Sequence, residues 1–404
     1  MARRFPYPQR LALTLATTMP NTRKVIAVAD GPAEGFPGVV RAGPLLFVSG
    51  CEGHRDRTTG RILPELAAEA EAQCENAYGR IADLLARAGS SMDRVVRLDH
   101  FTSSQDWLAR RQSVRGRIWG KPAPLASTGV AAKMSGLNML TASVIAVVDA
   151  ADKQVLVDGP RYAMENIAAA VRGGPFVFVS GIRGTVDPRS GDRVAEETPE
   201  AFRLQTDVSC QTVRSILGEC ELTPDALLRV DTFLRDGARA SEAAAIHRRA
   251  LGSAPVASTT VALPLSARGE IEITALAAAK GVAKRVHAGA EGEPVAVTAA
   301  GLVFVGECLG LPGDRSAERS ALAGDAPAQL ERALGLLERA LQRAGTTLAD
   351  LVRIEVYVRD IYKSPSLAPL LRQRLRESPP TLIIAGAELD DCVEVKLNAI
   401  AVAA

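Results

Sequence analysis

Side chains that can do chemistry follow a glycine at three places in this 404-residue sequence, and each glycine ends a short apolar segment. A guanidinium there can hold the carboxylate of a small ligand, and a carboxylate can transfer protons. The residues next to the glycine differ between the segments: Cys51, Glu52 and His54 after Gly50, Ile182 and Arg183 after Gly181, and Glu307 and Cys308 after Gly306. The three glycine loops are therefore distinct candidate sites.

Metal and thiol chemistry are disfavoured by the same residues. The four histidines show no metal-ligand spacing, so we predict no metal site. Cys51 and Cys308 are the thiols nearest to the glycine loops, but no base is paired with either, so we do not predict a catalytic cysteine. No phosphate loop or dinucleotide fingerprint follows a predicted strand, and we expect no cofactor.

Composition excludes several classes of function. Lys and Arg number 48 against 46 Asp and Glu, and aromatic residues make up 4%, so the chain lacks the basic field and the stacking side chains typical of nucleic-acid binding. No apolar stretch reaches the roughly 18 residues of a membrane span, and scattered cysteines fit reduced thiols. We therefore expect a soluble cytoplasmic protein with a small-molecule ligand, no nucleic-acid partner and no membrane partner.

Residues 1–22 are interpreted as an N-terminal extension rather than a targeting peptide. Arg3, Arg4 and Arg10 precede the apolar residues 11–16, but this run is too short for a secretion signal and no convincing cleavage site follows it. The folded part of the chain is expected to begin near residue 23.

The rest of the chain repeats itself three times, and such self-similarity reports architecture directly. The segment that ends in Gly50 recurs before Gly181 and Gly306. A second apolar segment carries an arginine 47, 48 and 47 residues after the respective glycine, and a closing segment ends 49, 48 and 48 residues after that arginine. We therefore divide the chain into repeats at 23–150, 151–281 and 282–404.

Helices alternate with strands in each repeat, because the apolar periodicity changes from two to 3.6 residues between these segments. In the third repeat one apolar stripe is formed by Leu330, Leu334, Leu337, Leu341 and Ala344. The first helices are predicted to end at Gly89, Gly218 and Gly345, and second helices are predicted over roughly 105–118, 241–251 and 366–377. The pattern predicts an α+β unit with the order β-hairpin, helix, strand, helix, strand, strand.

Three features together resemble the RidA (YjgF) family: the Phe-Val-Ser-Gly strand, the Val-Arg-x-Asp strand, and a Pro-x-x-Ser-Thr segment before the closing strand. The resemblance covers nearly all of residues 24–404, three times over. It implies a chorismate-mutase-like fold, in which a mixed sheet is covered by two helices, and the trimer that single-unit members form. We therefore expect a monomeric, intramolecular pseudo-trimer, since tethering raises the effective concentration of the units.

The resemblance also implies an activity, which is hydrolysis of enamine or imine intermediates such as 2-aminoacrylate to a keto acid and ammonia, in clefts between units. Gly50, Gly181 and Gly306 match the family's ligand-binding glycine, and its closing-strand glutamate is retained only as Glu272. The family's arginine is absent from the matching segments, residues 124–128, 255–259 and 379–383. Three equivalent deaminase sites are therefore not expected.

We hypothesise that Arg183 supplies the missing guanidinium and that Glu272 is the acid/base on the closing strand of the same repeat; the alternative is that Arg183 is a solvated loop charge. Ligand contacts are also predicted for Ser258, Thr259 and Glu307. Two other functions stay open. One is a non-catalytic ligand-binding or scaffolding pseudo-trimer, and the other is a chorismatase-like hydrolase, since chorismatases resemble fused units of this fold.

A cation and an anion two residues apart on one strand face recur in every repeat, as Arg97 and Asp99, Arg229 and Asp231, and Arg353 and Glu355. We predict that they pair structurally near the pseudo-threefold axis rather than form a central ligand site. His100 lies on the opposite face of its strand and is predicted to be a satisfied or partly buried residue rather than a catalytic one.

Overall fold

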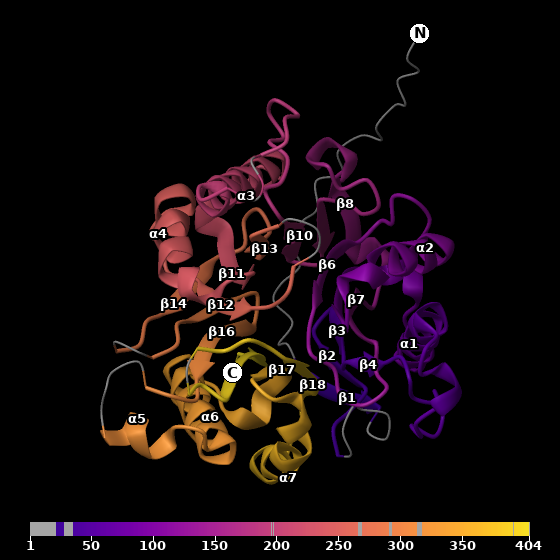
Figure 1. Cartoon of the computed structure of the whole chain (residues 1–404), viewed down its shortest axis with the longest axis vertical. Helices are drawn as coiled ribbons and strands as arrows, with labels where there is room; N and C mark the ends of the chain where they lie inside the picture. The colour runs from indigo at the N-terminus through magenta and orange to yellow at the C-terminus, as the bar shows by residue number, and fades with distance from the viewer. Residues whose placement is uncertain are drawn as a thin grey trace.

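The computed structural model describes residues 22–27, 35–194, 196, 198–265, 269–290, 293–312, 317–390 and 392–403. The expected N-terminal extension lies outside these residues, apart from Thr22. The described part of the chain forms three sheets around a common centre, with the long helices on the outside (Figure 1). We call the corresponding parts of the chain units 1, 2 and 3.

The three sheets share one strand order. In unit 1 the order is β1 (Arg23–Ala27), β2 (Val39–Ala42), β3 (Leu45–Val48), β7 (Leu140–Val147), β5 (Val95–Thr102) and β6 (Ala126–Ala131), and β4 (Cys51–Glu52) also pairs with β7. In unit 2 it is β8 (Lys153–Val157), β9 (Ala170–Gly173), β10 (Phe176–Ile182), β13 (Ile271–Ala278), β11 (Leu227–Leu234) and β12 (Ala257–Ala262). In unit 3 it is β14 (Lys284–His287), β15 (Ala296–Ala299), β16 (Leu302–Leu309), β19 (Val395–Val402), β17 (Leu351–Val358) and β18 (Thr381–Gly386).

Long helices cover one face of each sheet. They are α1 (Ala70–Arg87) and α2 (Leu108–Trp119) in unit 1, α3 (Ala201–Glu219) and α4 (Ala240–Leu251) in unit 2, and α6 (Ala326–Arg343) and α7 (Ser364–Leu375) in unit 3, where a short α5 (Ala317–Leu322) precedes them. The predicted stripe of α6 is buried against its sheet from Leu330 to Leu341. The predicted α+β class, with mixed sheets each covered by helices, is confirmed.

One predicted helix end is wrong. Gly218 lies inside α3, which continues to Glu219, and the chain leaves the helix through Glu221 in the left-handed region (φ 58°). Gly89 and Gly345, by contrast, adopt positive φ directly after their helices, where the absence of a Cβ atom makes that conformation easy. A glycine in the last turn is thus a weaker stop signal than one just beyond it.

The closing strands β7, β13 and β19 have two different faces. Alternate residues point to opposite sides of a strand, so on β13 Ile271 and Ile273 pack in the core under α3 and α4. Glu272 and Thr274 are equally buried but point to the other side, toward a neighbouring unit. Any site built on Glu272 therefore lies between units and not within one.

Consecutive units meet through equivalent serines. The backbone N–H of Ser127 on β6 donates to the Ser180 hydroxyl of unit 2, and that of Leu382 on β18 donates to the Ser49 hydroxyl of unit 1. At the third contact Gly306 lies against the backbone of Ser258 on β12. The short strand of each unit thus lies beside the glycine strand of the next unit, and we name the three contacts the unit 1/unit 2, unit 2/unit 3 and unit 3/unit 1 junctions.

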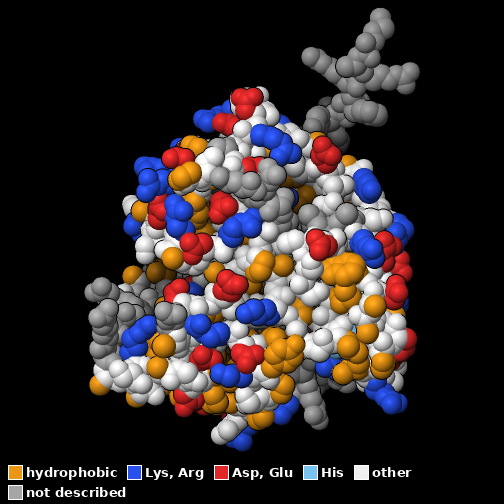
Figure 2. All heavy atoms as spheres, in the orientation of Figure 1, with side chains coloured by type: hydrophobic (Ala, Val, Ile, Leu, Met, Phe, Trp, Pro, Cys, Tyr) orange, Lys and Arg blue, Asp and Glu red, His pale blue; other side chains and the backbone are white. Residues whose placement is uncertain are grey.

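Two further features of the molecule are the distribution of its surface charge and the character of its helices. Basic and acidic side chains are interspersed over the face drawn in Figure 2, without a broad field of one sign. Within the described residues, no helix combines the length and the apolar character that crossing a bilayer requires.

Candidate functional site

The unit 1/unit 2 junction brings Glu272 against a glycine of its own unit and a short strand of the preceding unit. A side chain at Gly181 would collide with the Glu272 carboxylate, so this close approach requires glycine. The Thr128 hydroxyl of β6 lies 3.0 Å from the point where a Cβ atom at position 181 would stand. The junction is therefore built around one carboxyl group.

Burial dominates the chemistry of that carboxyl group. Glu272 is 4% exposed, and it accepts a hydrogen bond from the backbone N–H of Gly129. Desolvation raises the pKa of Glu272 above its ordinary value, because a charged carboxylate is poorly solvated there. The Gly129 N–H and nearby arginines oppose this rise. A carboxyl group with a raised pKa can act as a proton donor near neutral pH.

Arg183 stands at this junction. Its Nε lies 4.0 Å from Glu272 Oε2, and its side chain is 35% exposed while that of Glu272 is 6% exposed. Arg183 thus lies between solvent and the buried carboxyl group, where a guanidinium can contact an incoming anion. The structure brings together Gly181, Arg183 and Glu272 of the predicted site residues.

The sequence analysis missed Arg111. This residue of α2 is 6% exposed, and its guanidinium lies over Gly129, where any side chain would collide with it. Arg111 is close enough to Glu272 for each to shift the pKa of the other. The sequence could have predicted the burial of Arg111, because the helical period assigns its position to the buried face of α2.

The unit 2/unit 3 junction has a different arrangement. Lys396 of β19, at the position that matches Glu272, forms a 3.0 Å ion pair with Glu307. Glu307 also accepts from the Thr260 N–H, and Lys396 donates to the Thr260 carbonyl. The two charges neutralise each other and satisfy the neighbouring backbone, so this junction resembles a closed structural contact.

Other predicted ligand residues are distributed away from Glu272. Ser258 lies against Gly306, and Thr259 accepts a hydrogen bond from the Asn398 side chain, so both belong to the unit 2/unit 3 junction. The residue of unit 1 that matches Thr259, Thr128, is the one beside Glu272. Thr259 and Glu272 belong to the same repeat, but the fold places them at different junctions.

The unit 3/unit 1 junction carries no carboxyl group at the matching position. Thr141 stands there, and its hydroxyl accepts from the Asn138 amide. The Gly50 N–H donates to the Leu382 carbonyl, and the Gly306 N–H donates to that of Val295. These two backbone donors are therefore already bonded within the protein. The predicted match of Gly306 to Gly181 is wrong, because the Gly306 N–H takes the place of the Ser180 N–H and the strand register aligns Glu307 with Gly181.

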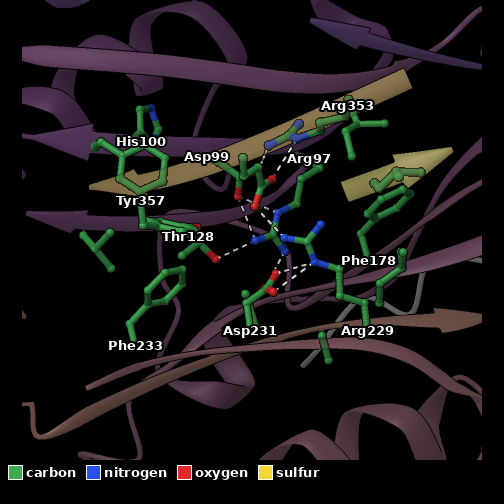
Figure 3. Close-up of a pocket in the computed structure, with 18 residues that line it drawn as sticks. Arg97, Asp99, His100, Thr128, Phe178, Arg229, Asp231, Phe233, Arg353 and Tyr357 are labelled. Carbon is green, nitrogen blue, oxygen red and sulfur yellow. Dashed lines mark hydrogen bonds and ion pairs between the residues drawn. The ribbon is translucent and has the colours of Figure 1, made fainter. Parts of the chain in front are cut away.

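The repeated arginine and acid pairs converge on the pseudo-threefold axis, as predicted. Around a cavity of about 50 Å³, Arg229 bonds to Asp231 and to Glu355, while Arg353 bonds to Glu355 and to Asp99 (Figure 3). Arg97 pairs with Asp99, and its other nitrogens donate hydrogen bonds to Thr274, Thr128 and the Val179 carbonyl. The charges bond to one another, which supports the predicted structural role.

The two thiols nearest to the glycine loops are enclosed by the protein. Cys51 and Cys308 are buried, and burial raises the pKa of the Cys308 thiol far above its ordinary range, so no reactive thiolate forms there. Among the described residues, no group of three or more His, Cys, Asp or Glu side chains is placed to hold a metal ion.

Comparison with known proteins finds a family match in unit 1. Residues 28–147 match the family described as endoribonuclease L-PSP. The Rid-family protein YyfA from Yersinia pestis is similar, with 19% identity and a TM-score of 0.29, and covers 31% of this chain and 100% of its own. Yeast Mmf1 is 19% identical, with a TM-score of 0.28, and covers 32% of this chain and 100% of its own.

A longer structure is also similar. A chorismatase is 16% identical to this chain, with a TM-score of 0.48, and covers 76% of this chain and 93% of its own. No match was found among curated proteins. The resemblance predicted from the sequence is confirmed by the family match in unit 1 and by three sheets that share one strand order.

Proposed function

We propose that this chain of three tandem RidA-like units is an enzyme that hydrolyses or deaminates an enamine-like or imine-like carboxylated metabolite at the unit 1/unit 2 junction. Glu272 transfers the proton, and Arg183 binds the substrate carboxylate. The observation that carries the proposal is the Glu272 carboxyl group, which is buried beside Gly181, has a raised pKa and lies 4.0 Å from Arg183. The matching positions of the other units hold Thr141 and Lys396.

The chemistry follows from the two protonation states of Glu272. With 2-aminoacrylate, the protonated carboxyl group donates its proton to the methylene carbon, and the enamine becomes an iminium ion. Water then adds to the carbon of the C=N bond and passes a proton back to the Glu272 carboxylate. Loss of ammonia from the resulting carbinolamine gives pyruvate, so one water is consumed and Glu272 returns to its starting state.

The first test is ammonia and keto-acid release from freshly generated 2-aminoacrylate and a small panel of other imines. Wild type is expected to exceed the uncatalysed background. Glu272→Gln keeps the shape of the side chain but cannot donate the proton, and it is expected to lower kcat by about 10²- to 10⁴-fold. Arg183→Ala is expected to raise KM more than it lowers kcat, because the guanidinium binds the carboxylate of both substrate and transition state.

A matched control lies at the position of unit 1 that corresponds to Glu272. Thr141→Val changes a buried polar residue of the unit 3/unit 1 junction and is expected to leave turnover unchanged. Turnover that survives Glu272→Gln, or that falls equally in Thr141→Val, would overturn the assignment to this junction. Cleavage of RNA without any deamination would favour the activity in the family's description instead.

A non-catalytic pseudo-trimer is the second candidate function. It is favoured by one observation, which is that the Lys396–Glu307 pair fills the unit 2/unit 3 junction with a structural contact. Absence of turnover on every imine in the panel, combined with saturable binding of a carboxylated ligand that Arg183→Ala abolishes, would support this binding role.

A further inference from the structure

A buried polar cluster in unit 1 replaces what is hydrophobic core in unit 3. The cluster consists of Cys74 and Tyr78 on α1, His100 on β5, and Arg111 and Arg115 on α2. All five are buried, with exposed fractions between 0 and 6%. They lie between the sheet and the two helices that cover it, on the side of the sheet away from the pseudo-threefold axis.

The matching positions show how unusual this cluster is. The second helices α2, α4 and α7 each have 12 residues and begin six residues after their strand, so their positions correspond one to one. Position four is Arg111, Ala243 and Leu367 in the three units, and position eight is Arg115, His247 and Leu371. In unit 3 the five matching residues are all buried and apolar: Leu330, Leu334, Val356, Leu367 and Leu371.

The cluster carries two positive charges without a bonded acid. Among the described residues, no carboxylate lies within 4 Å of the guanidinium of Arg111 or Arg115, and Nε of Arg111 has no hydrogen-bond acceptor. Burial lowers the pKa of both residues, that of Arg115 to about 10. An arginine side chain in a protein keeps its charge at neutral pH. Burying two unpaired cations is costly, and unit 3 shows that the fold accepts leucine at both places.

The other members of the cluster are neutral hydrogen-bonding groups. Tyr78 and His100 Nε2 are hydrogen-bonded to each other, while His100 Nδ1 has no well-aligned partner, although the Thr128 backbone lies near enough to raise the pKa of the imidazole. When the tyrosine hydroxyl donates to Nε2, Nδ1 carries the proton and is a buried donor. Burial lowers the pKa of His100 well below its ordinary value, so the imidazole adds donor capacity but no charge.

The cluster borders a groove on one side and the unit 1/unit 2 junction on the other. A groove of about 350 Å³ between α1 and α2 is lined by Tyr78 and Val114, and Val114 directly precedes Arg115. On the other side the Arg111 guanidinium lies over Gly129, whose N–H bonds to Glu272 at the unit 1/unit 2 junction.

We propose that Arg111 and Arg115, with Tyr78 and His100, form a buried binding site in unit 1 for a small oxyanion, a carboxylate or a phosphate. Two guanidiniums offer planar arrays of N–H donors that match the oxygens of such a group, and together they balance one or two negative charges. The oxyanion is either a free inorganic ion or the acidic group of an organic ligand. The proposal goes beyond the proposed activity and does not depend on it.

The test uses the full chain, without substrate, at constant ionic strength. The thermal midpoint is followed against increasing sodium phosphate and, separately, sodium acetate. Wild type is expected to show a saturable rise with at least one of them, because an ion that binds only the folded state stabilises it. A response to phosphate identifies a site open to free inorganic anions, whereas a response to acetate alone identifies a site for the carboxylate of an organic ligand.

The decisive variant copies unit 3. Arg111→Leu/Arg115→Leu is expected to have a higher midpoint than wild type without added anion, and its apparent affinity for the anion is expected to fall at least about tenfold. Arg87→Gln/Arg110→Gln removes the same charge from exposed positions of α1 and α2 outside the groove and is expected to keep the wild-type response. No saturable rise in wild type, or an equal rise in the leucine variant, would overturn the proposal.

A second measurement covers the case in which the leucine variant does not fold. Crystals of wild type soaked in selenate are expected to show an anomalous peak within hydrogen-bond distance of both guanidiniums. Peaks confined to other places would refute the site. Both measurements are independent of turnover, so a failed imine assay leaves this site standing, and a failed anion titration leaves the proposed activity standing.

Discussion

At the unit 1/unit 2 junction, the surroundings of one carboxyl group change its pKa. Glu272 is an ordinary glutamate in sequence, but its neighbours are Gly181, Thr128 and the Gly129 N–H. Desolvation shifts its pKa upward and thereby keeps a proton available. Arg183 remains partly exposed and beside it. One buried carboxyl group with one accessible cation is a compact arrangement for binding and protonating a small carboxylated molecule.

The raised pKa of Glu272 predicts a pH-dependent gain in stability for Glu272→Gln. The folded state holds this proton more tightly than the unfolded chain, so ionisation of Glu272 costs stability as the pH rises above about 4.5, the ordinary pKa of glutamate. Thermal midpoints of wild type and variant are expected to be similar near pH 4, with the variant increasingly more stable toward pH 8. A difference that does not grow with pH would mean that the arginines hold the carboxylate ionised.

Equivalent helices of the three units bury different chemistry on one backbone. Position eight of the second helix is an arginine in α2, a histidine in α4 and a leucine in α7. In α7, Leu371 belongs to the apolar core. In α4, His247 stands at the same position, and its Nε2 has no hydrogen-bond partner. The three units thus keep the same helix, but the side chains on its buried face differ.

His247 of α4 predicts that the folded state loses stability in acid. Desolvation lowers the pKa of His247 to about 4, so between pH 6.5 and 4 the unfolded chain takes up a proton that the folded state does not. The stability contribution of the neutral imidazole is present above pH 6.5 and is lost as the pH falls, by at most about 1.4 kcal/mol per unit. His247→Leu is expected to make thermal midpoints fall less steeply over that range.

The control for this prediction is a neighbour on the solvent side of the same helix. Arg248→Gln alters an exposed charge of α4 and is expected to keep the wild-type pH profile. A profile for His247→Leu as steep as that of wild type would assign the acid sensitivity to other groups, His100 among them.

The three units are held together at the axis by a network of buried charges. Glu355 accepts hydrogen bonds from Arg229 of unit 2 and from Arg353 of its own unit, and Arg353 also reaches Asp99 of unit 1. Because Glu355 bonds to arginines of two units, its loss leaves both arginines less well paired. The network therefore couples the stability of one unit to that of the others.

Glu355→Gln is expected to destabilise the whole molecule by about 3–5 kcal/mol, since it breaks a buried charge network on one side only. Urea unfolding is the measurement. Glu75→Gln, which removes an exposed partner of Arg117, is the control and is expected to cost less than about 1 kcal/mol. An equal effect of the two substitutions would show that the axial network contributes no more than a surface pair.

We also propose that the chain is a monomer, because three tethered units already occupy the places that three separate chains would fill. Sedimentation equilibrium is expected to give a mass near 42.6 kDa over a wide range of concentration. A mass near twice or three times this value would require an interface between chains in addition to the junctions between units.

The sequence by itself determined the three units, their strands and helices, and the absence of the family's arginine. These features are local, because the period of apolar residues and the spacing of Gly50, Gly181 and Gly306 depend only on neighbours along the chain. It also singled out Arg183, which follows the repeated glycine, and Glu272, which lies on the repeated closing strand. Ligand contacts were also predicted for Ser258 and Thr259, which lie at the unit 2/unit 3 junction.

Only the tertiary structure decided which unit completes which site. The short strand of each unit packs beside the glycine strand of the next, so Glu272 meets Thr128 and Gly129 of unit 1. The period of α2 assigns Arg111 to a buried face, but the packing of α2 on β6 is what sets its guanidinium over Gly129, next to that carboxyl group. Contacts between residues far apart in sequence depend on the order in which whole units pack, and no local pattern contains that order.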